Sequence, residues 1–199
     1  MKIVLVGGGA ANIFLALELV KAGPTVEMYE KTTGIGKKFL VAGKSDLNIT
    51  HSENKDLMAT RYYENEEHFS KLVDCFSNQD LIKWLDSFGI KTFTGSSKRV
   101  FPKDIRAKDI LEIWTNKLLS FSNFKLFTKQ ELTLIETDHI VFNDTYKVVF
   151  DKVVYALGGA SWARTGSSGT WTDLFKKFDI KCAKLPVPIP KNLFGNFKS

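Results

Sequence analysis

The sequence predicts an α/β fold in which a parallel, doubly wound sheet carries a β-meander insert. Three observations lead to this fold class. The chain opens with a strand, a glycine turn, a helix and a second strand, which is the order of a βαβ unit. Between residues 124 and 150 the apolar period falls towards two, as in antiparallel strands. A continuously apolar run at 152–157 then ends in another glycine turn, which is typical of a buried parallel strand.

The opening βαβ unit has the pattern of a dinucleotide site. The first strand, the helix and the second strand are predicted at residues 2–6, 13–20 and 25–29. Gly7 permits a sharp turn because glycine tolerates positive φ. Gly9 lets the backbone approach a pyrophosphate closely. The helix then opens with free N–H groups and the positive end of its dipole, which are expected to face that anion.

Glu30 and Asn12 refine this interpretation. Glu30 ends the second strand, about twenty residues after the turn, where an acid accepts hydrogen bonds from a ribose and disfavours a 2′-phosphate. NADP is therefore not the expected occupant. Asn12 stands where G-x-G-x-x-G has its third glycine, so we expect a local shift that accommodates it. The alternative is an α/β turn with chance glycines and no nucleotide.

The middle of the chain predicts polar loops followed by helices. Residues 31–36 and 39–51 are rich in Gly, Lys, Ser, Asn and Thr, which suits either a cover over a ligand or a surface turn. Residues 90–102 predict two short strands around Gly95, and residues 104–120 predict a helix. Two more helices between residues 65 and 88 have apolar faces that we assign to the core: Phe69, Leu72, Val73, Phe76, Leu81, Trp84, Leu85 and Phe88.

The last third of the chain predicts strands. Successive strands are expected at residues 124–127, 132–136, 139–142 and 146–150. His139 opens one of them and is expected to be structural or exposed. Residues 152–157 predict a central parallel strand that runs into Gly158 and Gly159. Since ligands lie beyond the carboxyl ends of parallel strands, this turn is expected to meet the same ligand. A short helix follows at 172–178, and alternating prolines at 185–190 favour an extended connector.

Composition limits the class of protein. A hydrophobic fraction of 44% indicates a globular chain, and no stretch has the apolar length of a membrane span or the pattern of a signal peptide. We therefore expect a cytoplasmic protein with no membrane partner. The net charge of +6 comes mostly from dispersed lysines, so no nucleic-acid partner is expected. Cys75 and Cys182 are isolated and are predicted to be buried thiols in a reducing compartment.

The sequence indicates no catalytic group and no metal site. It has no Ser-His-Asp set, no carboxylate pair and no metal-ligand spacing. His51 is the only group in the 39–51 loop that titrates near neutrality, which makes it a weak candidate for a catalytic role.

Several longer strings occur here in an order that resembles one family. They are GKKFL at 36–40, AGKSDLNITHSE at 42–53, GSSKRVFPK at 95–103 and LGGASW at 157–162. The chain resembles the bacterial FAD-dependent flavoproteins grouped with aminoacetone oxidase-like and bile-acid-reductase-like NAD(P)/FAD oxidoreductases, over nearly all of residues 1–190.

The resemblance implies a Rossmann-like FAD-binding domain. It further implies flavin-mediated hydride or electron transfer on a small molecule, with NAD(P)H as a candidate electron donor. The residues expected to bind FAD are Gly7, Gly9, Ala10, Ala11, Glu30, Lys31, Lys37, Lys38, Gly43, Asn48, Thr50, Ala156, Leu157, Gly158 and Gly159.

Members of that family are much longer than this chain. Residues 1–184 are therefore expected to form the first part of the FAD-binding domain, incomplete without a C-terminal return, and residues 185–199 to lead towards a substrate domain. Such an N-terminal fragment is expected to be inactive alone. Two alternatives remain open. One is an NAD-dependent dehydrogenase domain, which shares Glu30 but does not need residues 43–50. The other is a non-catalytic, truncated remnant.

Overall fold

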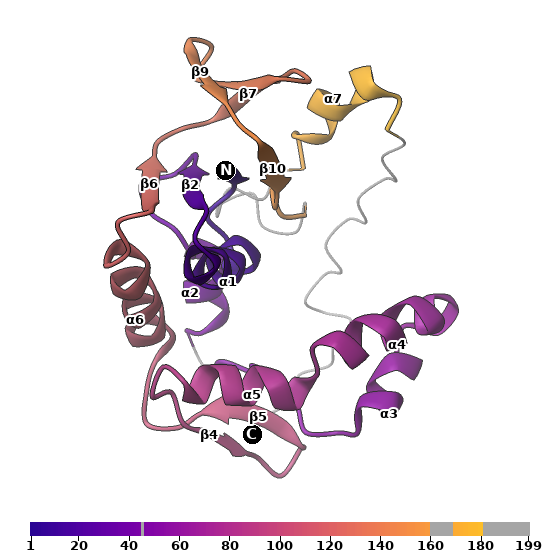
Figure 1. Ribbon diagram of the computed structural model, residues 1–199. Coiled ribbons are helices and arrows are strands. Elements are labelled where there is room, and N and C mark those ends of the chain that lie inside the picture. Colours follow the sequence, from indigo (N-terminus) through magenta and orange to yellow (C-terminus); the bar gives the residue numbers. More distant parts are fainter. Residues whose placement is uncertain (45, 160–168, 181–199) are drawn as a thin grey trace. The chain divides into compact units, whose positions relative to one another are not determined.

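The computed structural model describes residues 1–44, 46–159 and 169–180 (Figure 1). The chain divides into two compact units, residues 1–39 with 116–199 and residues 40–115. The residues predicted as a connector, 185–199, lie outside the described part, as does Cys182. The division of the chain into a domain at 1–184 and a connector stays a prediction.

The first unit is built on a four-stranded parallel sheet. Its strands are β1 (Lys2–Val6), β2 (Thr25–Glu30), β6 (Phe124–Thr128) and β10 (Lys152–Tyr155), in the order β10-β1-β2-β6. Helix α1 (Ala10–Leu19) and a 3₁₀ turn (Val20–Ala22) connect β1 to β2. From β1 the chain thus adds β2 and β6 on one side of this strand, and it later adds β10 on the other side. The predicted Rossmann-type α/β fold is confirmed, and its topological switch point lies between β1 and β10.

Two strands differ from their predicted places. Residues 124–127 were grouped with the antiparallel strands, but β6 pairs in parallel with β2. Its alternating pattern reflects an edge position, where Phe124 is buried and Lys125 is exposed. Strand β10 is parallel, as predicted, but among the described strands it lies at the other edge of the sheet rather than at its centre.

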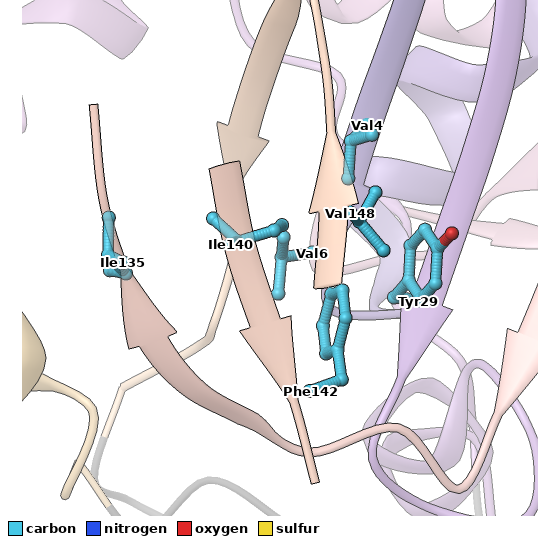
Figure 2. Packing of buried hydrophobic residues seen from close by; sticks show 7 residues of the cluster. All are labelled: Val4, Val6, Tyr29, Ile135, Ile140, Phe142 and Val148. Carbon is cyan, nitrogen blue, oxygen red and sulfur yellow. The ribbon is translucent and has the colours of Figure 1, made fainter. Parts of the chain in front are cut away.

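The predicted β-meander is present. Strands β7 (Leu132–Ile135), β8 (His139–Phe142) and β9 (Tyr146–Val149) form an antiparallel sheet in the order β7-β8-β9. Three residues, 143–145, separate β8 from β9. Asn143 and Asp144 both adopt positive φ, and the Thr145 N–H donates to the Phe142 carbonyl at 3.2 Å, as in a type I′ turn. The meander packs on the parallel sheet through a cluster shown in Figure 2, which comprises Val4, Val6, Tyr29, Ile135, Ile140, Phe142 and Val148.

Tyr29 is the contribution of β2 to that cluster. Its ring stacks between Phe127 and Phe142, with ring centroids 4.7 and 4.3 Å away. Its hydroxyl donates a hydrogen bond to Glu27 Oε2 at 3.0 Å, and Lys2 Nζ lies 3.0 Å from the same oxygen. Burial and the neighbouring Glu27 carboxylate raise the pKa of Tyr29 far above its usual value, so the phenol stays protonated and a donor.

The second unit combines short helices with a small antiparallel sheet. Its helices are α3 (Lys55–Thr60), a 3₁₀ turn (Tyr63–Asn65), α4 (Glu66–Cys75) and α5 (Asn78–Asp86). Its strands are β3 (Thr50–His51), β5 (Arg99–Pro102) and β4 (Thr92–Thr94), in the order β3-β5-β4. Helices α2 (Lys37–Ala42) and α6 (Ala107–Leu119) run across the divisions between the units. Helix α7 (Thr172–Phe175) and a 3₁₀ turn (Lys176–Phe178) belong to the first unit.

The apolar face of α4 was assigned to the core, and this is wrong in part. Leu72 and Phe76 are 49% and 41% exposed, and Cys75, predicted to be buried, is exposed as well. Helical periodicity identifies an apolar face but not what covers it. On α5 the assignment holds for Leu85, which is 1% exposed. Within the described residues, no helix is long and apolar enough to cross a membrane.

We expect Tyr29→Phe to destabilise the first unit without disturbing its packing. The substitution keeps the stacked ring but removes the hydroxyl that bonds the Glu27 carboxylate, and a hydrogen bond to a charged group contributes about 1.5–3 kcal/mol. Urea unfolding followed by circular dichroism measures the change. Tyr63→Phe is the control, because Tyr63 is 81% exposed. Equal losses in the two variants would contradict a special role for the buried hydroxyl.

Candidate functional site

The candidate site lies at the carboxyl ends of β1, β2 and β10. Strand β1 turns at Gly7, whose φ is +99° and whose N–H donates to the Tyr29 carbonyl at 2.8 Å. The Ala156 N–H donates to the Val6 carbonyl at 3.0 Å. A Cβ at Gly7 would lie 2.5 Å from the Ala156 oxygen. Glycine is therefore required here both by conformation and by the closeness of the residue after β10.

Gly8 is held from two sides. Its N–H donates to Glu30 Oε2 at 2.7 Å, and its carbonyl accepts from the Gly36 N–H at 2.7 Å. A Cβ at Gly8 would lie 2.4 Å from the Ile35 Cγ2 methyl. Sequence reasoning gave no role to Gly8 or Ile35. The G-x-G-x-x-G pattern leaves the second position open, and it does not show that the loop after β2 contacts the turn after β1.

Asn12 bonds the turn that it follows. Its side chain is buried, at 1% exposure, and its Nδ2 donates to the carbonyls of Val6 at 3.0 Å and Gly7 at 2.8 Å. The interpretation of Asn12 as a residue merely accommodated by a local shift is thus wrong. The amide bonds two carbonyls at the end of β1; with a glycine here the Val6 carbonyl would keep the Ala156 N–H, but the Gly7 carbonyl would lose its side-chain donor. Its Oδ1 is buried with no hydrogen-bond partner among the described residues.

The N-terminus of α1 is open to a ligand. Gly9 is the N-cap, no side chain caps the helix, and its first turn carries no acidic residue. Ala10 and Ala11 are exposed, and a Cβ built at Gly9 would meet no atom within 4 Å. The first N–H groups of a helix and the positive end of its dipole attract anions. This end of α1 therefore has the form of a phosphate site.

Glu30 links the end of β2 to the glycine turn. Besides the Gly8 N–H, its carboxylate accepts the Thr32 N–H, on Oε1 at 2.8 Å. An ionised carboxylate offers about four acceptor positions, so these two bonds leave capacity for ligand hydroxyls. The half-buried Glu30 thus has two roles available to it. It positions the turn, and it can receive a ribose.

The turn after β10 meets the same edge of the sheet. Leu157 packs against the hydrophobic cluster of the meander. Gly158 has φ +75°, and its carbonyl accepts from Trp171 Nε1 at 2.9 Å. A Cβ at Gly159 would meet open space. The structure thus brings together, at the switch point of the sheet, the predicted residues Gly7, Gly9, Ala10, Ala11, Glu30, Ala156, Leu157, Gly158 and Gly159.

The other predicted cofactor residues occupy separate positions. Lys31 is exposed directly after β2, and Lys37 and Lys38 open α2. Gly43, Asn48 and Thr50 belong to the second unit. A Cβ at Gly43 would lie 2.3 Å from the Ala107 Cβ, which gives this glycine a packing role. Asn48 is exposed, and Thr50 pairs with Val100. Their part in binding a cofactor stays a prediction.

His51 has a local partner that sequence reasoning did not find. Its Nδ1 accepts the Glu53 N–H at 3.3 Å. The Glu53 carboxylate lies nearby and is bound by Arg61 at two nitrogens, with the shortest distance 2.6 Å. Asn78 then donates to the carbonyls of both His51 and Glu53, at 2.6 and 2.9 Å. These contacts fix the end of β3 in the second unit.

Comparison with known proteins assigns a family at this point. Residues 1–186 match the family described as HI0933-like protein Rossmann domain, which covers most of the chain. The chain belongs to this family. One relative, the ribosomal RNA dihydrouridine synthase of Haemophilus influenzae, is 26% identical over 189 residues. This match includes 89% of the chain and 45% of the relative. The chain thus spans less than half the length of that relative.

Solved structures show the same fold at low identity. The 3-ketosteroid-Δ4-(5α)-dehydrogenase of Rhodococcus jostii matches with a TM-score of 0.61 and 14% identity, over 80% of this chain and 46% of that one. PqsL of Pseudomonas aeruginosa, described as a probable FAD-dependent monooxygenase, matches with a TM-score of 0.50 and 14% identity. That match covers 94% of this chain and 48% of PqsL.

Replacing Asn12 by Gly, which restores the G-x-G-x-x-G pattern, is expected to weaken this HI0933-like domain. The substitution removes the amide that bonds the Val6 and Gly7 carbonyls. Val6 keeps the Ala156 N–H, but the Gly7 carbonyl loses its side-chain donor, and an acceptor left unpaired costs about 1–3 kcal/mol. Urea unfolding measures the stability, and titration of flavin fluorescence measures affinity for FAD. The control is Asn116→Gly on the exposed side of α6, where helix propensity alone costs a few tenths of a kcal/mol. Unchanged stability and equal or better FAD binding would support the simple glycine pattern instead.

Proposed function

We propose that this chain is the FAD-binding portion of a flavin-dependent oxidoreductase. The proposed enzyme is one of the aminoacetone oxidase-like and bile-acid-reductase-like flavoproteins. The observation that carries the proposal is that the N-terminus of α1 is uncapped and that the Glu30 carboxylate binds the glycine turn which leads into this helix. Membership of the HI0933-like Rossmann family and the fold shared with PqsL support it. When bound, the flavin supplies hydride and electron transfer.

The geometry suits the ADP half of FAD. A pyrophosphate at Gly9, Ala10 and Ala11 would meet free N–H groups where a glycine leaves open space. The adenosine ribose would then reach the remaining acceptor positions of Glu30. FMN has no adenosine to use this carboxylate, and the 2′-phosphate of NADP would be repelled by it. Lys31, Lys37 and Lys38 supply positive charge to the same end of the first unit. A cytoplasmic location is part of this proposal.

An NAD-dependent dehydrogenase is the main competitor from the same geometry. NAD also carries a pyrophosphate and an unmodified ribose, so α1 and Glu30 suit it equally well. The similarity to a structure described as FAD-dependent and the resemblance of residues 43–50 to a flavin-contacting loop favour FAD.

The absorption spectrum of the purified protein tests the function directly. We expect the chain to retain or take up FAD and to show flavin bands, with weaker uptake of FMN and none of NADP. A colourless protein that binds NAD in preference to FAD would establish the dehydrogenase. Failure to bind either nucleotide would point to a non-catalytic remnant.

Two substrate classes fit a flavin enzyme of this kind. The resemblance to flavin oxidoreductases favours a small molecule, with NAD(P)H as the electron donor. The relative from Haemophilus influenzae acts, by its description, on ribosomal RNA, which favours a uracil base in RNA as a second candidate. The two are distinguished by asking whether the FAD-loaded chain binds ribosomal RNA in a gel-shift assay, a measurement that does not need turnover by this chain.

Glu30→Ala is expected to weaken FAD binding by about 1.5–3 kcal/mol, the range for a lost hydrogen bond to a charged group. Its effect on FMN should be smaller, because FMN has no adenosine ribose. Fluorescence titrations with both flavins give the comparison, and Glu112→Ala at an exposed position of α6 is the control. If Glu30→Ala weakened FAD and FMN equally, Glu30 would act only through the Gly8 and Thr32 N–H groups.

A further inference from the structure

One face of the small sheet in the second unit presents aromatic and cationic side chains together. Side chains alternate between the two faces of a strand, and the pairing places Phe93 opposite Phe101 and His51 opposite Arg99. These four residues therefore share a face. Val100, which lies between two of them on β5, points to the other face and is 1% exposed. The face that carries Phe93 is thus the outer one.

The aromatic pair on this outer face is accessible. Phe93 is 49% exposed, and its ring centroid lies 5.7 Å from that of Phe101 at an interplanar angle of 31°. Phe101 is half-buried, and a Cβ at Gly95 would lie 3.3 Å from its ring edge. Phe101 thus lies beside the Phe93 ring, and Phe93 keeps about half of its surface accessible.

Positive charge is concentrated in the same segment. Residues 91–109 contain six basic side chains and two acidic ones, whereas residues 40–115 as a whole contain eleven basic and twelve acidic side chains. The six basic residues are Lys91, Lys98, Arg99, Lys103, Arg106 and Lys108, and the two acidic residues are Asp104 and Asp109. The second unit is therefore close to neutral but polarised, with its excess of cations on and around the β4–β5 hairpin.

Several of these cations have no counter-ion in the fold. Lys91 pairs with Asp86 and Arg106 with Asp109, but Arg99 and Lys103 are exposed and form no ion pair within the described residues.

The carboxylate of Glu53, which follows the end of β3, does not neutralise Arg99 and Lys103. Glu53 is engaged by Arg61, which lowers the pKa of Glu53. Arg99 and Lys103 are thus available to anions in solution.

We propose that this outer face of the β3-β5-β4 sheet binds single-stranded RNA, with a base stacked on Phe93 and backbone phosphates bound by Arg99 and Lys103. The inference rests on the flavin oxidoreductase proposed above acting on RNA. Aromatic platforms beside a cationic track are how proteins bind single strands without reading sequence. Charge complementarity favours an anionic occupant, because four of the six cations here are lysines, and protein–protein interfaces are depleted of lysine even though they are enriched in aromatic residues and arginine.

This inference departs from the expectation that no nucleic acid binds. That expectation was drawn from lysines dispersed along the whole chain. Dispersion in sequence does not preclude clustering on one surface: the strand register places Phe93, Phe101 and Arg99 on one face, and Lys103 follows directly after β5.

Fluorescence anisotropy with a labelled oligouridylate of about ten nucleotides tests the proposal on the 199-residue chain. Phe93→Ala is expected to weaken binding about 5- to 150-fold, the loss expected for one stacked base. The double change Arg99→Ala with Lys103→Ala should lower the slope of log affinity against log salt by about 1.4, since each lost phosphate contact contributes about 0.7.

Matched controls lie on the meander and β10. Val149→Ala removes an apolar side chain that is 58% exposed, and Lys147→Ala with Lys152→Ala removes two exposed cations. Both controls should leave RNA affinity nearly unchanged. Absence of RNA binding at low salt would overturn the proposal, as would equal losses in the test and control variants. A dimer that is disrupted by Phe93→Ala in sedimentation would overturn it too, in favour of a second copy as the occupant.

FAD titration of the same variants separates this inference from the proposed function. The sheet face lies in the second unit and the glycine turn in the first, so Phe93→Ala should bind FAD like the unaltered chain. FAD binding without RNA binding would refute the RNA surface alone. RNA binding that depends on Phe93, in a chain that binds no flavin, would refute the flavin oxidoreductase and leave the surface established.

Discussion

The candidate site depends on one hydrogen bond, from the Gly8 N–H to the Glu30 carboxylate. It joins the glycine turn after β1 to the end of β2, so the two strands present their ends as one rigid edge. The Gly36 N–H and the Asn12 side chain hold the same turn from other directions. Because these bonds are made by the protein alone, the N–H groups at the start of α1 are oriented before any ligand arrives. Such preorganisation lowers the entropy lost on binding.

The same turn explains why its three glycines are not interchangeable. Gly7 is required by its positive φ and by the oxygen of Ala156, and Gly8 is required by the Ile35 side chain. Gly9 faces open space, so a side chain there would obstruct only a ligand. Two glycines are thus required by the fold, whereas Gly9 is not. A substitution at Gly9 should therefore affect ligand binding with little effect on folding, whereas a substitution at Gly7 should affect both.

Periodicity and glycine spacing were sufficient to predict the parallel sheet, the meander and the position of the turn, because these follow from local patterns. They failed where the outcome depends on distant partners. Strand β6 alternates like a meander strand yet pairs with β2, and the apolar face of α4 leaves Leu72 exposed. Asn12 looked like a lost glycine because a one-dimensional pattern does not show the Val6 and Gly7 carbonyls that its amide reaches.

The first unit is discontinuous, since residues 40–115 interrupt it between β2 and β6. As the chain emerges during synthesis, β1, α1 and β2 appear first, while the strands that flank them, β6 and β10, follow much later. Until then a two-stranded parallel ribbon exposes both of its edges, which are templates for pairing with other chains. Closing the sheet also requires contacts of large sequence separation, which form slowly. The nascent protein is therefore most vulnerable to misassembly while its inserted unit is being made.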